Sequence, residues 1–515
     1  MSAVSLLAQA TDVAETLETP GVDWWGVMPV LLLAAPAMVL LHVSSLVKRF
    51  FPGFYALVTV VVALVTFGWA VGLWTRVTDP DRGPFSTLGG AFGVDGFSVF
   101  FIFIMCASVV IAALLADDYL RREGMDGAEL YSLILLSASG GVIMASANDL
   151  IVMFLGLEIL SLAVYVLAAM HVGRRASQEA GMKYFVLGAF SSGFFLYGVA
   201  LVYGATGGTS LLHINAFLAE NVPDDDRLLL GGMALLLVGF GFKVAAVPFH
   251  SWSPDVYQGS PSPVVAYMAS GVKAAGFAGL LRVFVVALGG ARVDWQPIVY
   301  VLAVASLLVG AMLAVIQTDV KRMMAYSSIS HAGFILVGVE AGTSDGIAAA
   351  LFYLFAYTFM IGGTFGVISL VSRRGDGRHA IDDYRGLARG RPLLALVFTV
   401  LLLAQAGVPL TSGFFAKFAV VAAAIDARSF WLAVVAMVAT AISVFVYLRV
   451  IVAMYMTDAP ATAPAEGEVA EGASEGELVA EGASPAEPAE PGLVPAPGRL
   501  RIPWTAGLAL GWPSR

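Results

Sequence analysis

The chain alternates long apolar runs with short stretches of charged residues, glycine and proline. A transmembrane helix needs about 20 apolar residues to cross about 30 Å of hydrocarbon. The runs are continuous rather than alternating, which argues against a membrane β-barrel. We therefore predict an all-α polytopic membrane protein with thirteen clear spans. They cover residues 24–46, 54–75, 95–116, 130–148, 150–171, 180–204, 228–250, 263–288, 297–317, 322–341, 346–372, 393–425 and 430–456.

The end of the chain departs from this pattern. The apolar stretch 502–512 is too short to span a bilayer, so it predicts either a fourteenth helix that is cut short or a tail at the interface. The predicted domains are an external segment 1–23, a transmembrane domain 24–456, an acidic loop 457–500 and a partial helix 501–515. The loop repeats VAEGAS and is rich in Pro, Ala, Gly and Glu, which predicts disorder. It is either a tolerated insertion or an acidic docking strip.

Basic residues in the short loops predict the orientation of the chain. With the N-terminus outside, fourteen Lys and Arg residues fall in inside loops and five in outside loops. Cytoplasmic loops of membrane proteins carry the excess of positive charge. We therefore expect a multi-pass membrane protein with an external N-terminus and a cytoplasmic loop at 373–391.

Composition agrees with a membrane protein and excludes several functions. The chain is 59% hydrophobic and 13% charged. Nine of its acidic residues lie between Asp458 and Gly498; outside that segment, 28 basic residues face 28 acidic ones, which gives no sign of nucleic-acid binding. Cys106 is the only cysteine, so no intramolecular disulfide, haem attachment or iron–sulfur framework can form. Any electron transfer would occur in a partner.

Four of the six lysines lie within apolar runs: Lys183, Lys243, Lys273 and Lys417. Each costs about 2.5–3.5 kcal/mol at a helix centre on insertion scales. Arginine keeps its proton in proteins, whereas a buried lysine readily changes its protonation state. The pattern predicts protonation chemistry inside the membrane. Snorkelling to the interface or static ion pairing is the alternative, and it is strongest for Lys183 near its helix start.

Two further titratable residues lie in the middle of apolar runs. Glu158 is the only carboxylate well inside a span in the first half of the chain, so it is the natural partner of a lysine. Displacement of Glu158 would make that lysine release its proton. His331, whose side chain type titrates near neutral pH, is a candidate relay between Lys273 and Lys417. A static ion pair and a structural histidine remain the alternatives.

Prolines interrupt two of the runs. Pro248 lies beside His250, and Pro409 precedes Lys417. Irregular backbone at membrane depth survives only inside protein or along a hydrated cavity, and transporters place their ion sites at such breaks. Lys243 and Lys417 are therefore predicted protonatable sites near broken helices. His250 is a candidate for either helix capping or proton entry.

These residues lie in motifs that resemble the antiporter-like membrane subunits of respiratory complex I and the related multisubunit cation/proton antiporters. The resemblance covers roughly residues 25–456, and the pattern around Pro248 and Tyr257 is most similar to subunit N of bacterial NADH-quinone oxidoreductase. The motifs are FLGLEILSLAVYVLAA, KYFVLGAFSSGFFLYG, FKVAAVPFHSWSPDVYQGSPSPV, KAAGFAGLLRV, DVKRMMAYSSISHAGF and GVPLTSGFFAKF.

The resemblance implies a fold of fourteen helices with two inverted five-helix repeats, each containing a broken helix. It implies that Glu158 pairs with Lys183 or Lys243, that Lys273 continues a polar axis through His331, and that Lys417 lies towards a second half-channel. This chain would hold no cofactor. NADH, FMN, iron–sulfur clusters and quinone would belong to partner subunits, and the neighbours would be other membrane-arm subunits, including sister antiporter-like ones.

Three functions follow as hypotheses. The first is a proton-translocating subunit of a complex that oxidises NADH and reduces quinone. The second is a subunit of a multisubunit sodium/proton antiporter, which uses a similar lysine axis without NADH. The third is a scaffold whose channel is silent, in which neutralising Glu158 or Lys243 would harm assembly and leave pumping intact.

Overall fold

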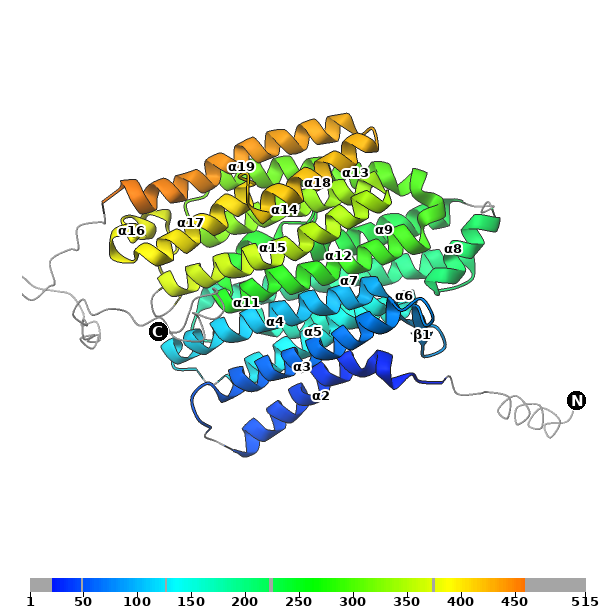
Figure 1. Cartoon of the computed structure of the whole chain (residues 1–515), viewed down its shortest axis with the longest axis horizontal. Helices are drawn as coiled ribbons and strands as arrows, with labels where there is room; N and C mark the ends of the chain where they lie inside the picture. The colour runs from blue at the N-terminus through cyan, green and yellow to red at the C-terminus, as the bar shows by residue number, and fades with distance from the viewer. Residues whose placement is uncertain (1–20, 48–49, 126, 222–225, 373–375, 459–515) are drawn as a thin grey trace, which may run out of the picture.

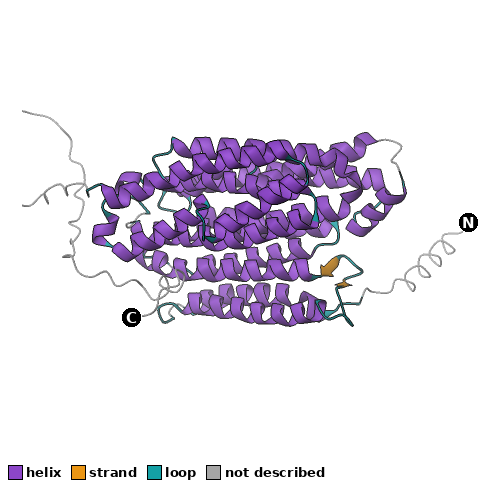
Figure 2. Cartoon of the chain, turned by 45° about the horizontal axis from the view of Figure 1, so that its top comes forward, coloured by secondary structure: helices purple, strands orange, loops and turns teal. Residues whose placement is uncertain are grey.

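The helices of the molecule lie side by side in one elongated bundle (Figure 1). The structure is a computed structural model, and it describes residues 21–458 except 48–49, 126, 222–225 and 373–375. The predicted segments 1–23, 457–500 and 501–515 therefore lie almost entirely outside the described residues, as does the stretch 502–512. Figure 2 shows that, apart from one small hairpin, the regular structure is helical.

The first half of the chain forms helices that cross the bundle and two short strands. Its elements are α2 (Trp24–Leu46), α3 (Phe54–Val77), β1 (Phe85–Thr87), β2 (Phe92–Val94), α4 (Gly96–Glu123), α5 (Ala128–Ser146), α6 (Leu150–Ala168), α7 (Arg175–Thr206), α8 (Leu211–Glu220) and α9 (Asp226–Val244). The strands pair antiparallel, with Phe85 opposite Val94.

The second half begins after the break that follows α9, and one of its spans contains two π-helical segments. Its elements are α10 (Trp252–Gly259), α11 (Ser262–Tyr267), the π-helices η1 (Met268–Val272) and η2 (Arg282–Ala287) around α12 (Lys273–Leu281), the 3-10 helix η3 (Gly289–Ala291), α13 (Arg292–Val315), α14 (Val320–Ala341), α15 (Ser344–Val371), the 3-10 helix η4 (Ile381–Tyr384), α16 (Leu387–Gly390), α17 (Pro392–Ala406), α18 (Ser412–Asp426) and α19 (Phe430–Met456).

Short polar side chains fix where several of these helices begin. A side-chain oxygen at the N-cap accepts a hydrogen bond from a free N–H group of the first turn. In α4 the cap is reciprocal, because Asp95 accepts from the Ser98 amide and the Ser98 hydroxyl accepts from the Asp95 amide. Side-chain caps of this kind start α2, α4, α6, α14, α15 and α18 at Asp23, Asp95, Asp149, Asp319, Thr343 and Thr411.

The structure bears out most of the predicted spans and corrects two of them. Among the described residues, eleven helical segments are long and apolar enough to cross a membrane. The run 228–250 is helical only to Val244, and the run 393–425 is two helices, α17 and α18, because each contains a proline turn. The run 322–341 is confirmed as the full helix α14, which is long enough to cross a membrane and falls outside the eleven by its composition. The sequence reading missed α8 and the hairpin.

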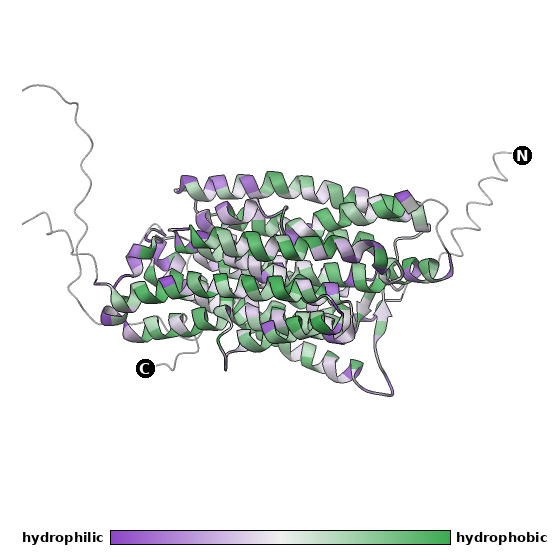
Figure 3. Cartoon of the chain, turned by 90° about the horizontal axis from the view of Figure 1, so that it is seen from above, coloured by the Kyte–Doolittle hydropathy of each residue, from purple (hydrophilic) through white to green (hydrophobic). Residues whose placement is uncertain are grey.

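The most buried helices lie in the middle of the bundle, and the others face outward. In α4, η1, α12, α14 and α15 most side chains are buried, whereas α2, α3 and α7 expose long apolar faces. Hydrophobic residues dominate the lengths of the helices, as Figure 3 shows. Helices approach closely at small residues: an added Cβ on Gly140 of α5 would lie 2.5 Å from the Leu160 nitrogen of α6. Small residues at helix interfaces are typical of membrane bundles.

Candidate functional site

The first buried lysine lies where α6, α7 and α9 meet. Lys243 is 3% exposed, and its Nζ donates a 2.7 Å hydrogen bond to the Ser161 hydroxyl. Glu158 lies one turn before Ser161 on α6, so the two share a helix face, and its Oε1 accepts a short hydrogen bond from Ser192 of α7. Glu158 acts electrostatically on Lys243 without forming a direct ion pair.

A small cavity lies beside Lys243, between α6, α7 and α9. It measures about 10 Å³, which is room for about one water molecule. Its lining includes the hydroxyls of Ser161, Ser191 and Ser192 together with Lys243. The arrangement places hydroxyl groups, rather than direct contact, between the acid and the base.

The second buried lysine is bonded to one residue. Lys273, which is 2% exposed, begins α12. Its Nζ donates to the hydroxyl and the carbonyl of Ser328 at 2.5 and 2.7 Å. Lys243 lies close by, because an added Cβ on Gly276, one turn after Lys273, would meet the Lys243 Cγ at 3.1 Å. The ring of Tyr357 lies 5.8 Å from the Lys273 Nζ.

His331 lies one turn after Ser328 on α14, within a cluster of tyrosines. Its Nδ1 is 2.7 Å from the Tyr353 hydroxyl and its Nε2 is 3.1 Å from the Tyr447 hydroxyl. The Tyr357 ring lies 4.8 Å from the imidazole, and its buried hydroxyl has no partner among the described residues. His331 therefore lies between Lys273 and a group of phenols, and it contacts no lysine directly.

The third buried lysine lies at the second helix break. Lys417, which is 6% exposed, donates a 3.0 Å hydrogen bond to the Ala406 carbonyl at the end of α17. Its Nζ lies 4.8 Å from the centre of the Phe334 ring, one turn beyond His331. Gly407 closes α17 in the left-handed conformation, with φ +85°, and an added Cβ there would lie 2.9 Å from the Lys417 Cδ. A larger residue would strain the backbone and press on the lysine.

The two prolines lie in turns at the surface of the bundle. Pro248 and Pro409 are both exposed, in the segments that separate α9 from α10 and α17 from α18. His250 is half-buried, its carbonyl accepts from the Ser253 amide at 2.9 Å, and its Nδ1 has no described partner. The backbone contact fits capping of α10, while the imidazole contacts none of the three lysines. Lys243 and Lys417 each lie within a few residues of one of these breaks.

Lys183 is not a buried lysine, which corrects the expectation from its apolar surroundings. Its side chain is 41% exposed and forms 2.7 Å ion pairs with Glu179 and Asp255. Arg322 binds the other oxygen of Asp255 at 2.6 Å. The pairing of Glu158 with Lys183 is therefore not observed. Lys183 instead lines a polar cavity of about 480 Å³ at the end of the bundle where α7 starts and α10 ends.

A different lysine is buried with a charged partner. Lys321 is fully buried, and its Nζ donates to the Asp376 Oδ2 at 2.9 Å and to the Ser260 carbonyl at 2.6 Å. Arg174 donates to the same carboxyl oxygen at 3.1 Å. Burial alone would raise the pKa of Asp376, but Lys321 and His379 hold it well below its usual range. This cluster ties the loop after α15 to α7, α11 and α14.

Several groups at the site were missed by the sequence reading. They are hydroxyls: Ser161, Ser192, Ser328, Tyr353 and Tyr447. The available signal was spacing, because Ser161 follows Glu158, and Ser328 precedes His331, by three residues along a helix. No group of three or more His, Cys, Asp or Glu side chains in the described part of the chain is placed to hold a metal ion.

The fold and the buried lysines define a helical, multi-pass membrane protein of the antiporter-like class. Residues 147–443 match the family described as NADH:quinone oxidoreductase/Mrp antiporter, TM. NADH-quinone oxidoreductase subunit N of Trichlorobacter lovleyi is 43% identical over 390 residues, which cover 75% of this chain and 78% of that protein.

Solved structures give the same assignment. A chain in respiratory complex I from Thermus thermophilus with bound aureothin matches with a TM-score of 0.69 and 35% identity, over 83% of this chain and 89% of that one. A chain of the Mrp complex from Dietzia sp. shares the fold, with a TM-score of 0.73 at 23% identity over 84% and 81% of the two chains. The present chain belongs to this antiporter-like family, as a member of its NADH-quinone oxidoreductase subunit N group.

Proposed function

We propose that this chain is the subunit N that translocates protons in a bacterial NADH-quinone oxidoreductase, and that Glu158, Lys243, Lys273, His331 and Lys417 form the proton path. One observation carries the proposal. Each of the three lysines of this path bonds to neutral oxygens and to no carboxylate among the described residues, unlike the buried Lys321. A lysine held in that way is not locked as an ammonium by a fixed counter-ion, so it can exchange a proton.

The first half of the path runs from Glu158 to Lys273. Ser161 and Ser192 bring hydroxyls to the cavity between Glu158 and Lys243, and a hydroxyl both donates and accepts. A proton moves from the carboxyl side to Lys243 through these hydroxyls and about one water. Lys243 packs against Gly276 of α12, one turn beyond Lys273, which receives the proton next.

The second half runs from Lys273 to Lys417 along α14. Lys273 and His331 are one turn apart through Ser328, and the unpartnered Tyr357 hydroxyl lies between them. A buried hydroxyl without a protein partner is normally satisfied by water, so Tyr357 would hold the bridging water. His331 passes the proton past Phe334 to Lys417 at the second break. Moving one charge against 100 mV costs about 2.3 kcal/mol.

The order of the helices supports the two inverted repeats. After α2, α3 and α4, the crossings of the first repeat are α5, α6, α7, the broken pair α9–α10, and α11–α12. Those of the second repeat are α13, α14, α15, the broken pair α17–α18, and α19. In both sets the fourth crossing is the broken one. With an external N-terminus, α5 starts at the cytoplasmic side and α13 at the external side, which inverts the second set. A fourteenth helix would come from residues beyond 458.

The remaining assignments follow from membership in such a complex. The chain would lie in the plasma membrane beside other membrane-arm subunits, including sister antiporter-like subunits, and would carry no cofactor. NADH, FMN, iron–sulfur clusters and quinone would be held by partner subunits. The hydrogen-bonded hydroxyls and lysines described above supply proton transfer only, so the energy must arrive from that redox reaction.

The test compares four variants in inside-out membrane vesicles: Lys243→Ala, Lys273→Ala, Lys417→Ala and the surface comparison Lys183→Ala. Proton pumping is followed with a pH-sensitive dye while NADH oxidation and complex assembly are measured in the same vesicles. We expect the three axis variants to lower protons pumped per NADH by about tenfold, and Lys183→Ala to stay near wild type. Full pumping per NADH in assembled Lys243→Ala complex contradicts the proposal and favours the silent scaffold.

A sodium/proton antiporter subunit is the second candidate, and the shared fold with the Mrp chain of Dietzia supports it at the level of fold. It is separated from the first by copurification. A tagged chain that runs with NADH-oxidising activity in a native gel supports the first function. Migration among small membrane proteins without that activity would favour the antiporter.

A further inference from the structure

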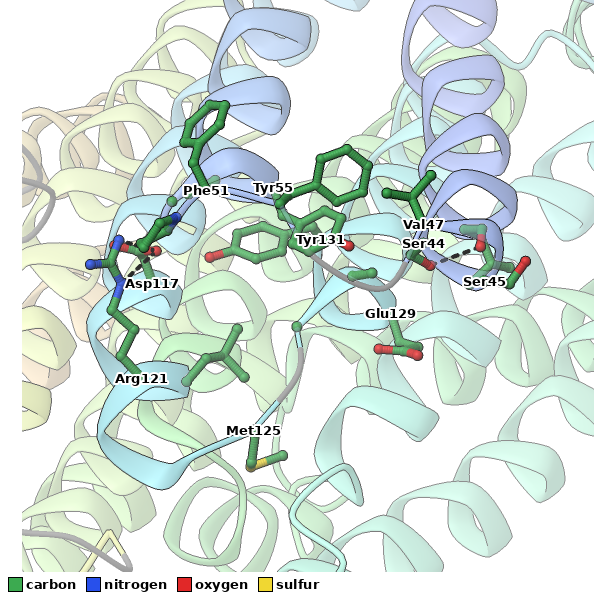
Figure 4. Close-up of a pocket in the computed structure, with 18 of the residues that line it drawn as sticks. Ser44, Ser45, Val47, Phe51, Tyr55, Asp117, Arg121, Met125, Glu129 and Tyr131 are labelled. Atoms are coloured by element: carbon green, nitrogen blue, oxygen red, sulfur yellow. Dashed lines mark hydrogen bonds and ion pairs between the residues drawn. The ribbon is translucent and has the colours of Figure 1, made fainter.

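A cavity of about 880 Å³ opens where the carboxyl end of α2, the start of α3, the end of α4 and the start of α5 meet. It lies away from the lysine path, at the edge of the bundle, where α2 tilts away from its neighbours (Figure 1). Its volume falls within the range of about 300–1,000 Å³ typical of small-molecule sites. Figure 4 shows side chains from all four helices around this space.

One part of the cavity wall is apolar and aromatic, while His42, Ser44 and Ser45 line another part. Tyr55 of α3 and Tyr131 of α5 stack with ring centroids 6.4 Å apart, and Leu120 and Met125 line the same space. Gly53, directly before α3, lies close to the mouth, because an added Cβ there would meet the Arg121 Nη2 at 3.1 Å. An occupant would therefore need an apolar part to fill this wall.

The mouth of the cavity is charged. Arg121 binds Asp117 through Nε and Nη2, at 3.2 and 2.8 Å, and its Nη1 has no partner among the described residues. Glu129, exposed in the first turn of α5, forms no ion pair with any described residue. A donor and an acceptor of opposite charge thus remain available at the two sides of the opening (Figure 4).

The level of the mouth matches the membrane–water interface. The apolar run of α2 ends at Leu46 and that of α3 begins at Phe54, so the cavity lies at the end of two helices that expose apolar faces. Tyrosine and tryptophan rings are enriched at this level, where one end of the ring is apolar and the other is wet. Phospholipid headgroups occupy the same level.

We infer that this cavity binds one zwitterionic phospholipid whose headgroup carries a primary ammonium, as in phosphatidylethanolamine. The phosphate accepts from the free Nη1 of Arg121, the ammonium donates to the Glu129 carboxylate, and the upper acyl chains lie against Tyr55, Leu120 and Tyr131. Arginine and carboxylate contacts of this kind are charge-assisted hydrogen bonds. Among the described residues of the mouth, two carboxylates stand against one guanidinium, which favours a headgroup with an ammonium over one with phosphate alone.

The test uses the whole complex in nanodiscs of equal phosphatidylethanolamine and phosphatidylglycerol. One lipid at a time carries a diazirine at the top of an acyl chain, and photolabelled peptides are identified by mass spectrometry. Wild type is compared with Glu129→Gln and with Glu220→Gln, an exposed carboxylate of α8 at the other end of the bundle. We expect labels from the ethanolamine lipid on residues 117–131, reduced about tenfold by Glu129→Gln and unchanged by Glu220→Gln.

The glycerol lipid is the second arm. Its labels on residues 117–131 should be about tenfold weaker than those of the ethanolamine lipid in wild type and unaffected by Glu129→Gln. Equal or stronger labelling by the glycerol lipid overturns the assignment of the headgroup. Labels spread evenly along the apolar faces of α2, α3 and α7, with no enrichment at 117–131, overturn the site itself. NADH-driven pumping is recorded in parallel, so that loss of the lipid is distinguished from loss of the proton path.

Discussion

Serine hydroxyls are the partners of two of the three lysines of the proposed proton path. A hydroxyl can accept from an ammonium and can equally donate to a neutral amine, whereas a carboxylate stabilises only the ammonium. Ser161 beside Lys243 and Ser328 beside Lys273 therefore let each lysine keep a hydrogen bond in both protonation states. Static ion pairs would lack this property.

Removal of the Ser328 hydroxyl tests this role. In Ser328→Ala, Lys273 keeps the carbonyl acceptor but loses the bonded hydroxyl that can donate to its neutral form, so we expect protons pumped per NADH to fall about tenfold. Pumping and NADH oxidation in vesicles provide the measurement. Ser330→Ala is the matched control, because Ser330 is equally buried on α14 and donates to the Leu307 carbonyl alone. Similar losses in both variants would point to damage of α14 rather than to Lys273.

The lysines also show which parts of the site could be predicted from sequence. Position within an apolar run correctly predicted that Lys243, Lys273 and Lys417 are buried. It was wrong for Lys183, which reaches Glu179 and Asp255 at the end of α7, and it missed Lys321, which is buried by a loop from 55 residues further along the chain. Local hydropathy contains no information on which distant loop covers a residue.

At the scale of elements, interruptions are as informative as helices. Prolines 248 and 409 predicted the two breaks, yet the lengths of the half-helices depend on tertiary contacts such as Lys417 against Ala406 and Gly407. The hairpin β1–β2 and helix α8 carry weak local signals and form at one end of the long helices. The sequence therefore predicted the crossings well, and the connecting segments poorly.

The loop after α15 is fixed by one buried carboxylate. Asp376→Asn would leave Lys321 as an unpaired buried charge, which costs about 3–5 kcal/mol, so we expect a large fall in the free energy of unfolding measured in mixed detergent micelles. Asp382→Asn is the matched control, because Asp382 pairs with Arg385 at the surface. An Asp376→Asn protein as stable as the control would mean that the cluster does not hold the loop.

The same carboxylate predicts a pH dependence. Its folded pKa lies well below the ordinary value of 3.8, so its ion pair contributes fully above that value and is lost as the pH falls towards the folded pKa. Wild-type stability should therefore decline more steeply than that of Asp376→Asn as the pH falls below about 4. Parallel declines in the two proteins would show that other carboxyl groups dominate.

At the scale of the whole molecule, charge asymmetry predicts the orientation. Arg174, Arg322 and the loop of Asp376 lie at one end of the bundle, and the hairpin and α8 lie at the other (Figure 1). The buried Cys106 is the only native cysteine, so introduced cysteines can be labelled without a large background.

We expect a membrane-impermeant maleimide to label Asp81→Cys, beside the hairpin, only in right-side-out vesicles. Arg389→Cys, in α16, should be labelled only in inside-out vesicles, because both side chains are exposed at opposite ends of the helices. Permeabilised membranes serve as the control, since both positions should then react. The reverse pattern would place the N-terminus inside and exchange the two half-channels.

The span that carries Lys273 has a consequence for how related sequences are compared. Its π-helical turns, Met268–Val272 and Arg282–Ala287, flank α12. Such a turn is equivalent to an α-helix with one residue inserted, and each insertion rotates the rest of the helix by about 100°. The direction in which the Lys273 side chain points therefore depends on the number of residues in the helical segment before it. Loss of one codon before it would leave the motif recognisable and turn the amine towards a different helix.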